Sequence, residues 1–368
     1  MPELTPAQVR SWRVHAQGLA GARDGVGAAD AARAAGALQA QDARACRLQV
    51  RARTSGLTAE DVDTACGAGD RSLVRTWLMR GTLHAVPAAD VRWMTSLLGP
   101  RAAAAQRGRR RQLGLDEETC ARALPLLEKA LAGRPPLLRD DLVHRLGGLG
   151  LTLDPRSQAP AHLLLYAAAL GLVCRGPEVA GDKSTYVLRE EWLDGVMGPD
   201  LSGADASAAL AQRYVSAYGP ATAADFAKWS GLPVGQARSG LRSAGAEVAG
   251  PDGTLWVPSG GDVPPPPAPS VRLIGHFDPY LLGYQDRDLL LDPSFARRVA
   301  TGGGLITPCL LVDGEVTGTW RHERGAGGRL TVRVDPFRPP PDAVAHGIEA
   351  EVADLGRFLG AEAGWEWA

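Results

Sequence analysis

Two stretches of the sequence repeat one order of elements at a spacing of roughly 80 residues, and this repeat restricts the folds open to the chain. Each stretch has three helical patterns followed by two short β patterns. The helical patterns lie at about 116–132, 138–146 and 159–170, and again at 205–218, 222–230 and 234–244; the β patterns lie at 172–175 and 185–189, and at 246–249 and 254–258. Asp252-Gly253 is a strong hairpin turn signal between the last two. Three helices and a hairpin make a winged helix, so the chain contains two predicted winged helices.

The first 112 residues give a less regular version of this pattern. Thr5 before Pro6 predicts the start of a helix over 4–19, and Thr58 predicts the cap of a helix over 59–67. Further helices are predicted over 28–39 and 71–80, followed by a strand over 81–86. Several short helices and a strand indicate a first, atypical winged-helix unit.

The composition changes after residue 260. Residues 261–269 are rich in proline and predict a stiff connector. Beyond them the pattern predicts strands over 270–274, 305–312, 315–321 and 330–334 and a helix over 342–359. The predicted fold class is α+β and mainly helical, with three tandem winged-helix motifs and a C-terminal β-rich element carrying a protruding hairpin. The predicted domains are 1–112, 113–200, 201–260, a connector at 261–270, and 271–368.

Charge and cysteine usage exclude several classes of protein. The formal net charge is −1 and the pI about 6.7, so any nucleic-acid contact needs a local basic face. No Cys-x-x-Cys or Cys/His cluster occurs, which predicts no metal site, no cofactor and reduced thiols; the cysteines are Cys46, Cys66, Cys120, Cys174 and Cys309. We find no signal peptide pattern and no apolar stretch of about 18 residues, and therefore predict a cytoplasmic protein without a membrane partner.

Gln39 and Gln41 form the most unusual polar feature of the chain, at the end of an apolar helical pattern. An amide neither gains nor loses a proton near neutral pH, so the pair is a poor general acid or base. It can orient a water molecule or hydrogen-bond a polar ligand. Side chains at i and i+2 of a helix point about 200° apart, so convergence on one site requires a break near Ala40. Helix capping or a buried hydrogen bond is the structural alternative.

Two other segments carry candidate cleft residues. Arg80 and His84 belong to the same predicted unit as the glutamines, and His276 and Asp278 follow a predicted strand. The structural alternative places His84 in a satisfied hydrogen bond on a strand. For the segment with His276 and Asp278, the structural alternative is that Asp278 caps a helix next to packed tyrosines.

Two basic segments are candidates for DNA contact. The predicted hairpin at 319–331 has a glycine-rich tip flanked by basic side chains, namely Arg321, His322, Arg324 and Arg329. Arginines on a protruding hairpin can enter a DNA groove and sense its width. The run at 107–111 includes Arg109 and Arg110, which could clamp a phosphate. A solvated surface is the alternative for both.

Together these segments resemble the AlkZ/YcaQ-like DNA glycosylases. The resemblance rests on the tandem winged-helix units, Gln-Ala-Gln at 39–41, Arg-Gly-Thr-Leu-His at 80–84, and Phe-Asp-Pro-Tyr-Leu-Leu-Gly-Tyr-Gln-Asp-Arg at 277–287. It covers essentially the whole chain. The Gln-Ala-Gln form is similar to the AlkZ branch, because the other branch has Asp where this chain has Gln41.

The resemblance implies a monomeric, monofunctional DNA glycosylase that excises N7-alkylguanine and unhooks interstrand crosslinks made by bifunctional alkylators such as azinomycin. It implies roles in DNA repair and self-resistance, and a C-shaped clamp of three winged helices around DNA. Gln39 and Gln41 would be the catalytic pair, and the 319–331 hairpin the DNA-probing element. The expected partner is damaged or crosslinked double-stranded DNA on the bacterial nucleoid, with no obligate protein partner.

Two other functions fit parts of the sequence. Tandem winged helices alone would suit a transcription regulator, although no long dimerisation helix is predicted. A resistance protein could instead sequester a free toxin. That function needs an aromatic-lined pocket, and aromatic residues make up only 5% of the chain.

Overall fold

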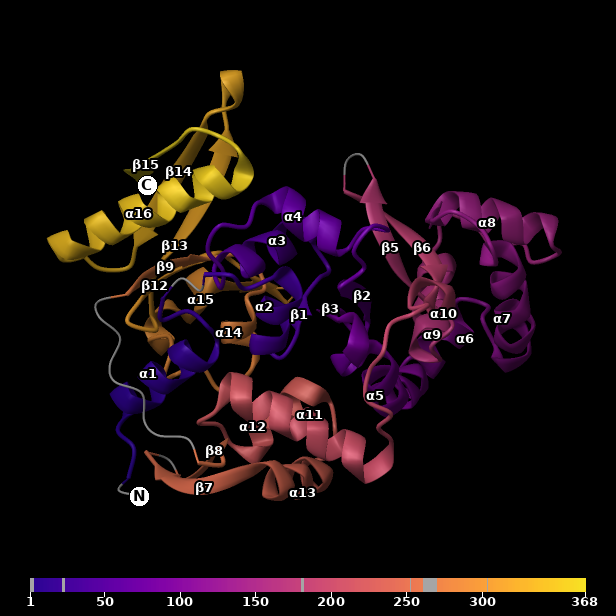
Figure 1. Cartoon of the computed structure of the whole chain (residues 1–368), viewed down its shortest axis with the longest axis horizontal. Coiled ribbons are helices and arrows are strands. Elements are labelled where there is room, and N and C mark those ends of the chain that lie inside the picture. The colour runs from indigo at the N-terminus through magenta and orange to yellow at the C-terminus, as the bar shows by residue number, and fades with distance from the viewer. Residues whose placement is uncertain (1–2, 22–23, 180–181, 252, 261–269, 303) are drawn as a thin grey trace. The chain divides into compact units, whose positions relative to one another are not determined.

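The computed structural model describes residues 3–21, 24–179, 182–251, 253–260, 270–302 and 304–368, and it has a mixed helix-and-sheet fold (Figure 1). Its contacts divide the chain into two units. The first unit joins residues 1–62 to Ala208–Ala368, and the second is Asp63–Ser207. The predicted segment 1–112 is therefore split at Val62, because its N-terminal part packs with the C-terminal segments. The predicted connector lies outside the described residues, apart from Ser270.

The N-terminal elements of the first unit confirm the predicted caps but not all of the predicted helices. The elements are α1 (Pro6–Ala16), α2 (Ala28–Ala34), β1 (Leu38–Gln39), α3 (Ala43–Arg51) and α4 (Ala59–Ala65). The Thr5 hydroxyl accepts from the Gln8 N–H at 3.3 Å, and the Thr58 hydroxyl accepts from the Asp61 N–H at 3.2 Å. Side-chain acceptors of this kind satisfy N–H groups that have no partner inside the helix.

The predicted helix over 28–39 is too long. It ends at Ala34, and Gly36 follows with a φ of +76°. A Cβ atom at Gly36 would lie 3.0 Å from the Tyr218 ring, so glycine fits both the left-handed backbone and the close contact. The helix break therefore comes before the glutamine motif rather than at Ala40, and α3 was not predicted.

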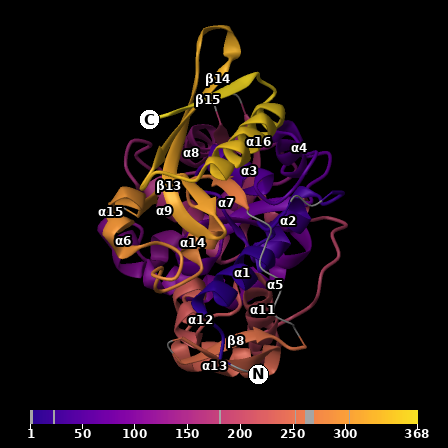
Figure 2. The same ribbon diagram turned by 90° about the vertical axis from the view of Figure 1, so that its left-hand side faces the viewer.

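The C-terminal part of the first unit contains a five-stranded sheet with the strand order β15-β14-β13-β12-β9. The strands are β9 (Val271–Ile274), β12 (Cys309–Val312), β13 (Glu315–Arg324), β14 (Leu330–Pro336) and β15 (Ala363–Trp367). The helix α16 (Asp342–Leu359) lies along this sheet, and its buried stripe is Val344, Ile348, Val352 and Leu355. The β13–β14 hairpin extends past the end of α16 (Figures 1 and 2). The parallel edge strand β15 was not predicted.

Short elements complete this part of the unit. They are α14 (Pro279–Leu282), α15 (Ala296–Val299), β10 (Ala300–Gly302) and β11 (Leu305–Ile306). The strand predicted over 305–312 is therefore two strands, β11 and β12.

The repeat predicted at 205–258 is confirmed element by element. It forms α11 (Gly203–Tyr218), α12 (Ala223–Ser230), α13 (Val234–Ala244), β7 (Gly245–Gly250) and β8 (Gly253–Pro258). Thr222 and Asp225 make the capping box that starts α12, and the two strands pair antiparallel. Asp252 of the predicted turn lies outside the described residues.

The second unit contains the other predicted repeat. Its elements are β2 (Leu73–Trp77), β3 (Leu83–Pro87), α5 (Val91–Ala105), α6 (Arg107–Gln112), α7 (Glu117–Leu131), β4 (Leu137–Leu138), α8 (Arg139–Gly148), α9 (Ala159–Ala169), β5 (Val173–Val179), β6 (Lys183–Leu188) and α10 (Arg189–Trp192). The three helices α7, α8 and α9 precede the β5–β6 hairpin, as predicted. The clamp that the resemblance implies stays a prediction.

The helix predicted over 71–80 is wrong. Residues Leu73–Trp77 pair antiparallel with Leu83–Pro87, so both segments are strands of one hairpin. Val74, Thr76 and Trp77 are residue types that favour strands, and cross-strand packing outweighs the weak helical period. The basic run at 107–111 lies in the short helix α6.

Candidate active site

The side chains of Gln39 and Gln41 meet in the first unit. The Nε2 group of Gln39 donates to Oε1 of Gln41 at 2.8 Å. Gln39 is 8% exposed on β1, whereas Gln41 lies on the surface. The strand β1 ends at Gln39 and the chain bends at Gln41, so the pair converges outside any helix. The arrangement joins a buried amide to an exposed one.

A third glutamine, Gln49 on α3, fixes the backbone behind this pair. Its side chain is fully buried, and its Nε2 donates to the carbonyl of Gln39 at 3.0 Å and to that of His276 at 3.2 Å. Its Oε1 atom is buried without a hydrogen-bond partner among the described residues. The sequence analysis missed this residue. The available signal was its spacing. Gln49 lies three positions after Cys46, which places both side chains on the buried side of the helix.

His276 and Asp278 differ in what they offer to a ligand. His276 is half-buried, and its Nδ1 donates to the Ile306 carbonyl at 3.0 Å, so Nε2 is its other polar atom. Asp278 is fully buried and caps α14 by accepting from the Tyr280 N–H at 3.0 Å. The structure therefore supports the capping role for Asp278 and keeps His276 as a site candidate.

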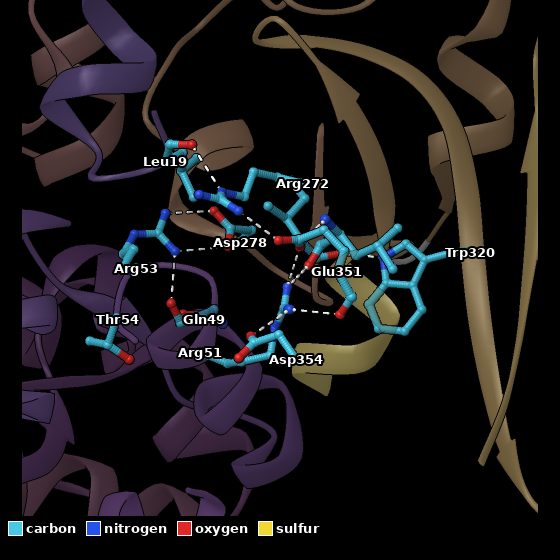
Figure 3. Close-up of polar contacts among 12 residues, drawn as sticks. Leu19, Gln49, Arg51, Arg53, Thr54, Arg272, Asp278, Trp320, Glu351 and Asp354 are labelled. Carbon is cyan, nitrogen blue, oxygen red and sulfur yellow. Dashed lines mark hydrogen bonds and ion pairs between the residues drawn. The ribbon is translucent and has the colours of Figure 1, made fainter. Parts of the chain in front are cut away.

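Buried ion pairs hold α3, the helix that carries Gln49, in place (Figure 3). Arg53 lies directly after α3 and contacts Asp278 at 2.7 and 3.0 Å. Arg51 contacts Glu351 of α16 at 2.8 Å, and Arg272 contacts the same carboxylate at 2.6 Å. Burial alone raises the pKa of Glu351, but the two guanidinium groups outweigh it and hold the pKa below its ordinary value.

The predicted hairpin residues are all exposed on or next to β13 and β14; they are Arg321, His322, Arg324 and Arg329. Some already have polar partners: Arg329 lies 3.5 Å from Glu362, and Arg324 donates to the Leu359 carbonyl at 3.2 Å. His322 stacks on Trp320 with ring centroids 5.7 Å apart.

His322 is electrostatically linked to the glutamine region. Its pKa is lowered by desolvation, with further contributions from Arg324, Arg44 and His276. Arg44 lies on α3, and His276 is held by Gln49. His322 therefore lies within electrostatic reach of Arg44 and His276, two residues that flank the glutamine pair in the first unit.

Comparison with known proteins decides the family. The model of the AlkZ-like DNA glycosylases matches residues 32–358. The chain belongs to the AlkZ-like DNA glycosylase family. It is therefore a DNA glycosylase, as the resemblance implied.

A relative and a solved structure agree with this assignment. The chain is 28% identical over 369 residues to an interstrand DNA cross-link repair glycosylase of Streptomyces sahachiroi, covering 96% of each protein. It is also similar to the solved structure of Streptomyces sahachiroi DNA glycosylase AlkZ, with a TM-score of 0.82, 26% identity and full coverage of both chains.

In the second unit of this glycosylase, Arg80 and His84 have different surroundings. Arg80 is exposed, whereas His84 is 3% exposed and its Nδ1 donates to the Thr82 carbonyl at 2.9 Å. Burial, assisted by the charge of Arg80, lowers the pKa of His84 to about 3. His84 is thus a neutral, satisfied core histidine, which is the structural alternative stated above.

The two arginines predicted to clamp a phosphate also differ. Arg109 is exposed and donates to Gln112 and Gln158 at 3.0 and 2.8 Å. Arg110 is only 4% exposed, donates to the Ala103 carbonyl at 2.6 Å and lies over the Tyr166 ring at 4.2 Å. Arg110 therefore presents no surface to DNA, in contrast to the prediction.

The described part of this glycosylase lacks two kinds of feature. No group of three or more His, Cys, Asp or Glu side chains there could hold a metal ion. No described helix is long and apolar enough to cross a membrane.

Proposed function

We propose that this glycosylase hydrolyses the N-glycosidic bond of N7-alkylated guanine in double-stranded DNA, and that it unhooks interstrand crosslinks made by bifunctional alkylators such as azinomycin. It acts in DNA repair and self-resistance. The observation that carries the proposal is the hydrogen-bonded pair of Gln39 and Gln41, which binds polar groups without exchanging protons.

The chemistry of the substrate matches such a pair. Alkylation at N7 makes guanine cationic, so the base leaves without a general acid. The sugar becomes positively charged, and a positioned water completes the hydrolysis. The hydrogen bond between the two amides leaves the Gln39 Oε1 atom and the Gln41 Nε2 group for these tasks. Oriented dipoles and a held water can lower the barrier without proton transfer.

The neighbouring carboxylates are already committed to structural roles. Asp42 caps α3 by accepting from the Arg44 and Ala45 N–H groups at 2.8 and 3.2 Å. Asp278 is fully buried against Arg53. Neither carboxylate is therefore as available for catalysis as the two amides.

The proposed activity is monofunctional. A lyase would normally use an amine to form a Schiff base with the sugar. The chain has only three lysines, and the first of them is Lys129, far along the sequence from the glutamines.

Crosslink unhooking rests on two arguments. The relative from Streptomyces sahachiroi is named for interstrand cross-link repair and matches 96% of this chain. A crosslinked guanine is tethered to the opposite strand and cannot flip fully into a closed pocket. The exposed position of Gln41 suits a substrate that stays in the duplex.

The test is base release from a duplex that carries one N7-methylguanine, followed by alkaline cleavage of the strand. We expect Gln39→Ala and Gln41→Ala each to slow release about 10²–10³-fold, the usual loss when an oriented polar group is removed. Gln212→Ala is the matched control, because Gln212 is an exposed glutamine whose side chain donates to Ser216. A duplex with a bifunctional alkylator crosslink tests unhooking in the same assay.

The rival functions predict other outcomes. Sequence-specific binding to undamaged DNA without base release would indicate a transcription regulator. Tight binding of free alkylator with no effect on damaged DNA would indicate sequestration. Either result would overturn the proposal.

A further inference from the structure

Arg175 on β5 makes no ion pair with the residues described in the second unit. Its guanidinium carbon lies 4.4 Å from the centroid of the Tyr186 ring and 5.0 Å from that of Trp77. The two rings are nearly parallel, at 10°, with centroids 6.5 Å apart. Contact with aromatic faces can hold a guanidinium in one orientation without using its N–H donors for hydrogen bonds.

The neighbouring arginine shows the contrast. Arg75, which pairs with Arg175 across β2 and β5, donates to the Glu178 carboxylate and, at 2.9 Å, to the Gly176 carbonyl. The side chain of Arg175 makes no hydrogen bond or ion pair with any residue that the structure describes, and its Nε atom is buried without a partner. Desolvation lowers its pKa, and the nearby Arg75 and Arg139 lower it further, against partial compensation by Tyr186 and Glu178.

Arg175 lines a polar cavity of about 330 Å³. The residues around the cavity are Leu138, Arg139, Asp140, Arg175, Lys183, Ser184 and Tyr186. Three of these side chains are cationic and one is a carboxylate. Including the adjacent Arg75 and Glu178, four cations face two carboxylates, an excess of two positive charges.

The N-terminal end of α8 lines the same cavity, with the carboxylates Asp140 and Asp141 in its first turn. Leu138 and Arg139 are the N-cap and first residue of α8, a helix of 10 residues whose N-cap makes no side-chain hydrogen bond. The first N–H groups of such a helix are available to an anion, and the helix dipole favours negative charge there. The helix packs beside β6, the strand that carries Lys183 (Figure 1).

We propose that this cavity binds one phosphate group of the DNA backbone. The proposal rests on the proposed function, since it takes DNA as the substrate. The tetrahedral phosphodiester monoanion fits a cavity lined by several cations, and guanidinium groups bind phosphate oxygens in pairs. The pocket is built by α8 and the β5–β6 hairpin of one predicted winged helix. Binding there would anchor the duplex independently of the lesion.

The experiment measures binding to an undamaged duplex by fluorescence anisotropy over a range of salt concentrations. Loss of one neutralised phosphate makes the slope of log K against log salt shallower by about 0.9. We expect this change in the double variant Arg175→Met, Lys183→Gln, in which methionine keeps the apolar contact with the two rings. Lys129→Gln is the control, because Lys129 is an exposed lysine of the same unit on α7 and does not line the cavity. It should keep the wild-type slope.

An unchanged slope in the double variant would overturn the proposal. If the Arg175→Met substitution abolishes the cooperative unfolding transition, the salt slope is measured instead in the double variant Arg139→Gln, Lys183→Gln. Both of these side chains are exposed, and the same change in slope is expected. Inorganic phosphate provides a second probe. Phosphate binding that the variants abolish, together with an unaltered DNA slope, would mean that the cavity takes a free anion and not DNA.

Base release separates this proposal from the proposed function. Single-turnover release of N7-methylguanine at saturating enzyme should stay at the wild-type rate in the cavity variants, because the cavity residues do not belong to the glutamine region. If wild type releases no base yet the slope changes, the glycosylase chemistry fails while the phosphate site stands.

Discussion

The pairing of Gln39 with Gln41 depends on Gln49. One buried amide group holds the carbonyls of Gln39 and His276 at 3.0 and 3.2 Å. Gln39 and His276, which are far apart in the sequence, are thereby held next to each other. Gln49 contacts none of the proposed reacting atoms, so we treat it as a positioning residue.

Gln49→Leu should lower the base-release rate more than it lowers DNA affinity. The two carbonyls lose their donor, which costs about 1–3 kcal/mol of stability, and Gln39 loses its fixed position. We expect at least about a tenfold lower single-turnover rate, equivalent to about 1.4 kcal/mol in the barrier. Gln17→Leu is the control, because Gln17 is also fully buried and makes two hydrogen bonds, to Ala217 and Arg53. Equal rate losses in both variants would contradict a positioning role.

His84 makes the protein sensitive to acid. Its pKa in the folded protein is about 3, below the ordinary 6.5, so the unfolded chain takes up a proton first as the pH falls. The stabilisation is complete above pH 6.5 and is lost as the pH falls toward 3. Between pH 7 and pH 5 this residue should account for about 2 kcal/mol of lost stability. Urea unfolding at both pH values should show a smaller difference in His84→Leu; an identical difference would exclude this source.

At the scale of elements, α3 connects the glutamine region to the C-terminal sheet and helix. Arg51 and Arg53 extend from its C-terminal end to Glu351 and Asp278. All four side chains are at most 7% exposed. Such pairs contribute little relative to apolar residues, but breaking one leaves a buried charge, which is costly.

Asp278→Ala should therefore lower the free energy of unfolding by about 3–5 kcal/mol, because Arg53 would stay buried without its carboxylate. Replacing both partners, as Arg53→Met with Asp278→Leu, should recover part of this loss. Asp354→Ala is the control, since Asp354 pairs with Arg51 at 3.1 Å but is 32% exposed. Chemical denaturation measures the free energy of unfolding of all three variants. Equal losses in Asp278→Ala and Asp354→Ala would mean that burial of the ion pair does not set the cost.

At the scale of the whole molecule, the first unit is assembled from two distant segments. Its N-terminal segment supplies α1 to α3, and Ala208–Ala368 supplies the sheet, α16 and most of the third predicted winged helix. The second unit is continuous and has its own buried cluster, which includes Leu127, Leu142, Leu163 and Tyr186.

This division predicts different behaviour for two fragments. Asp63–Ser207 should unfold cooperatively on its own, because its core is internal to the fragment. Ala208–Ala368 should not, since Asp278 and Glu351 would lose Arg53 and Arg51 and the sheet would lose its covering segment. Thermal unfolding followed by circular dichroism tests both; a cooperative transition in the second fragment would refute the prediction.

Most local signals gave correct predictions where neighbouring residues decide the structure; the exception is α3, whose Asp42 cap was missed. The helix caps at Thr5, Thr58 and Thr222 depend on contacts three residues away, and the helices Val234–Ala244 and Asp342–Leu359 follow their own apolar period. The failures at 28–39 and 71–80 lie where distant residues compete. Gly36, packed against the Tyr218 ring, follows the end of the first helix, and pairing with β3 makes the second segment a strand.

The sequence by itself determined the family, the helix-helix-helix-hairpin repeats and the choice of two amides as candidate catalytic groups. Those features depend on residue type and spacing along the chain. Only the tertiary structure decided that the two amides meet, that Gln49 holds the Gln39 carbonyl, that Asp278 and Arg110 are buried, and that Arg175 makes no ion pair with a described residue. These features depend on burial and pairing between segments far apart in the chain, and such long-range contacts leave no periodic signal in the sequence.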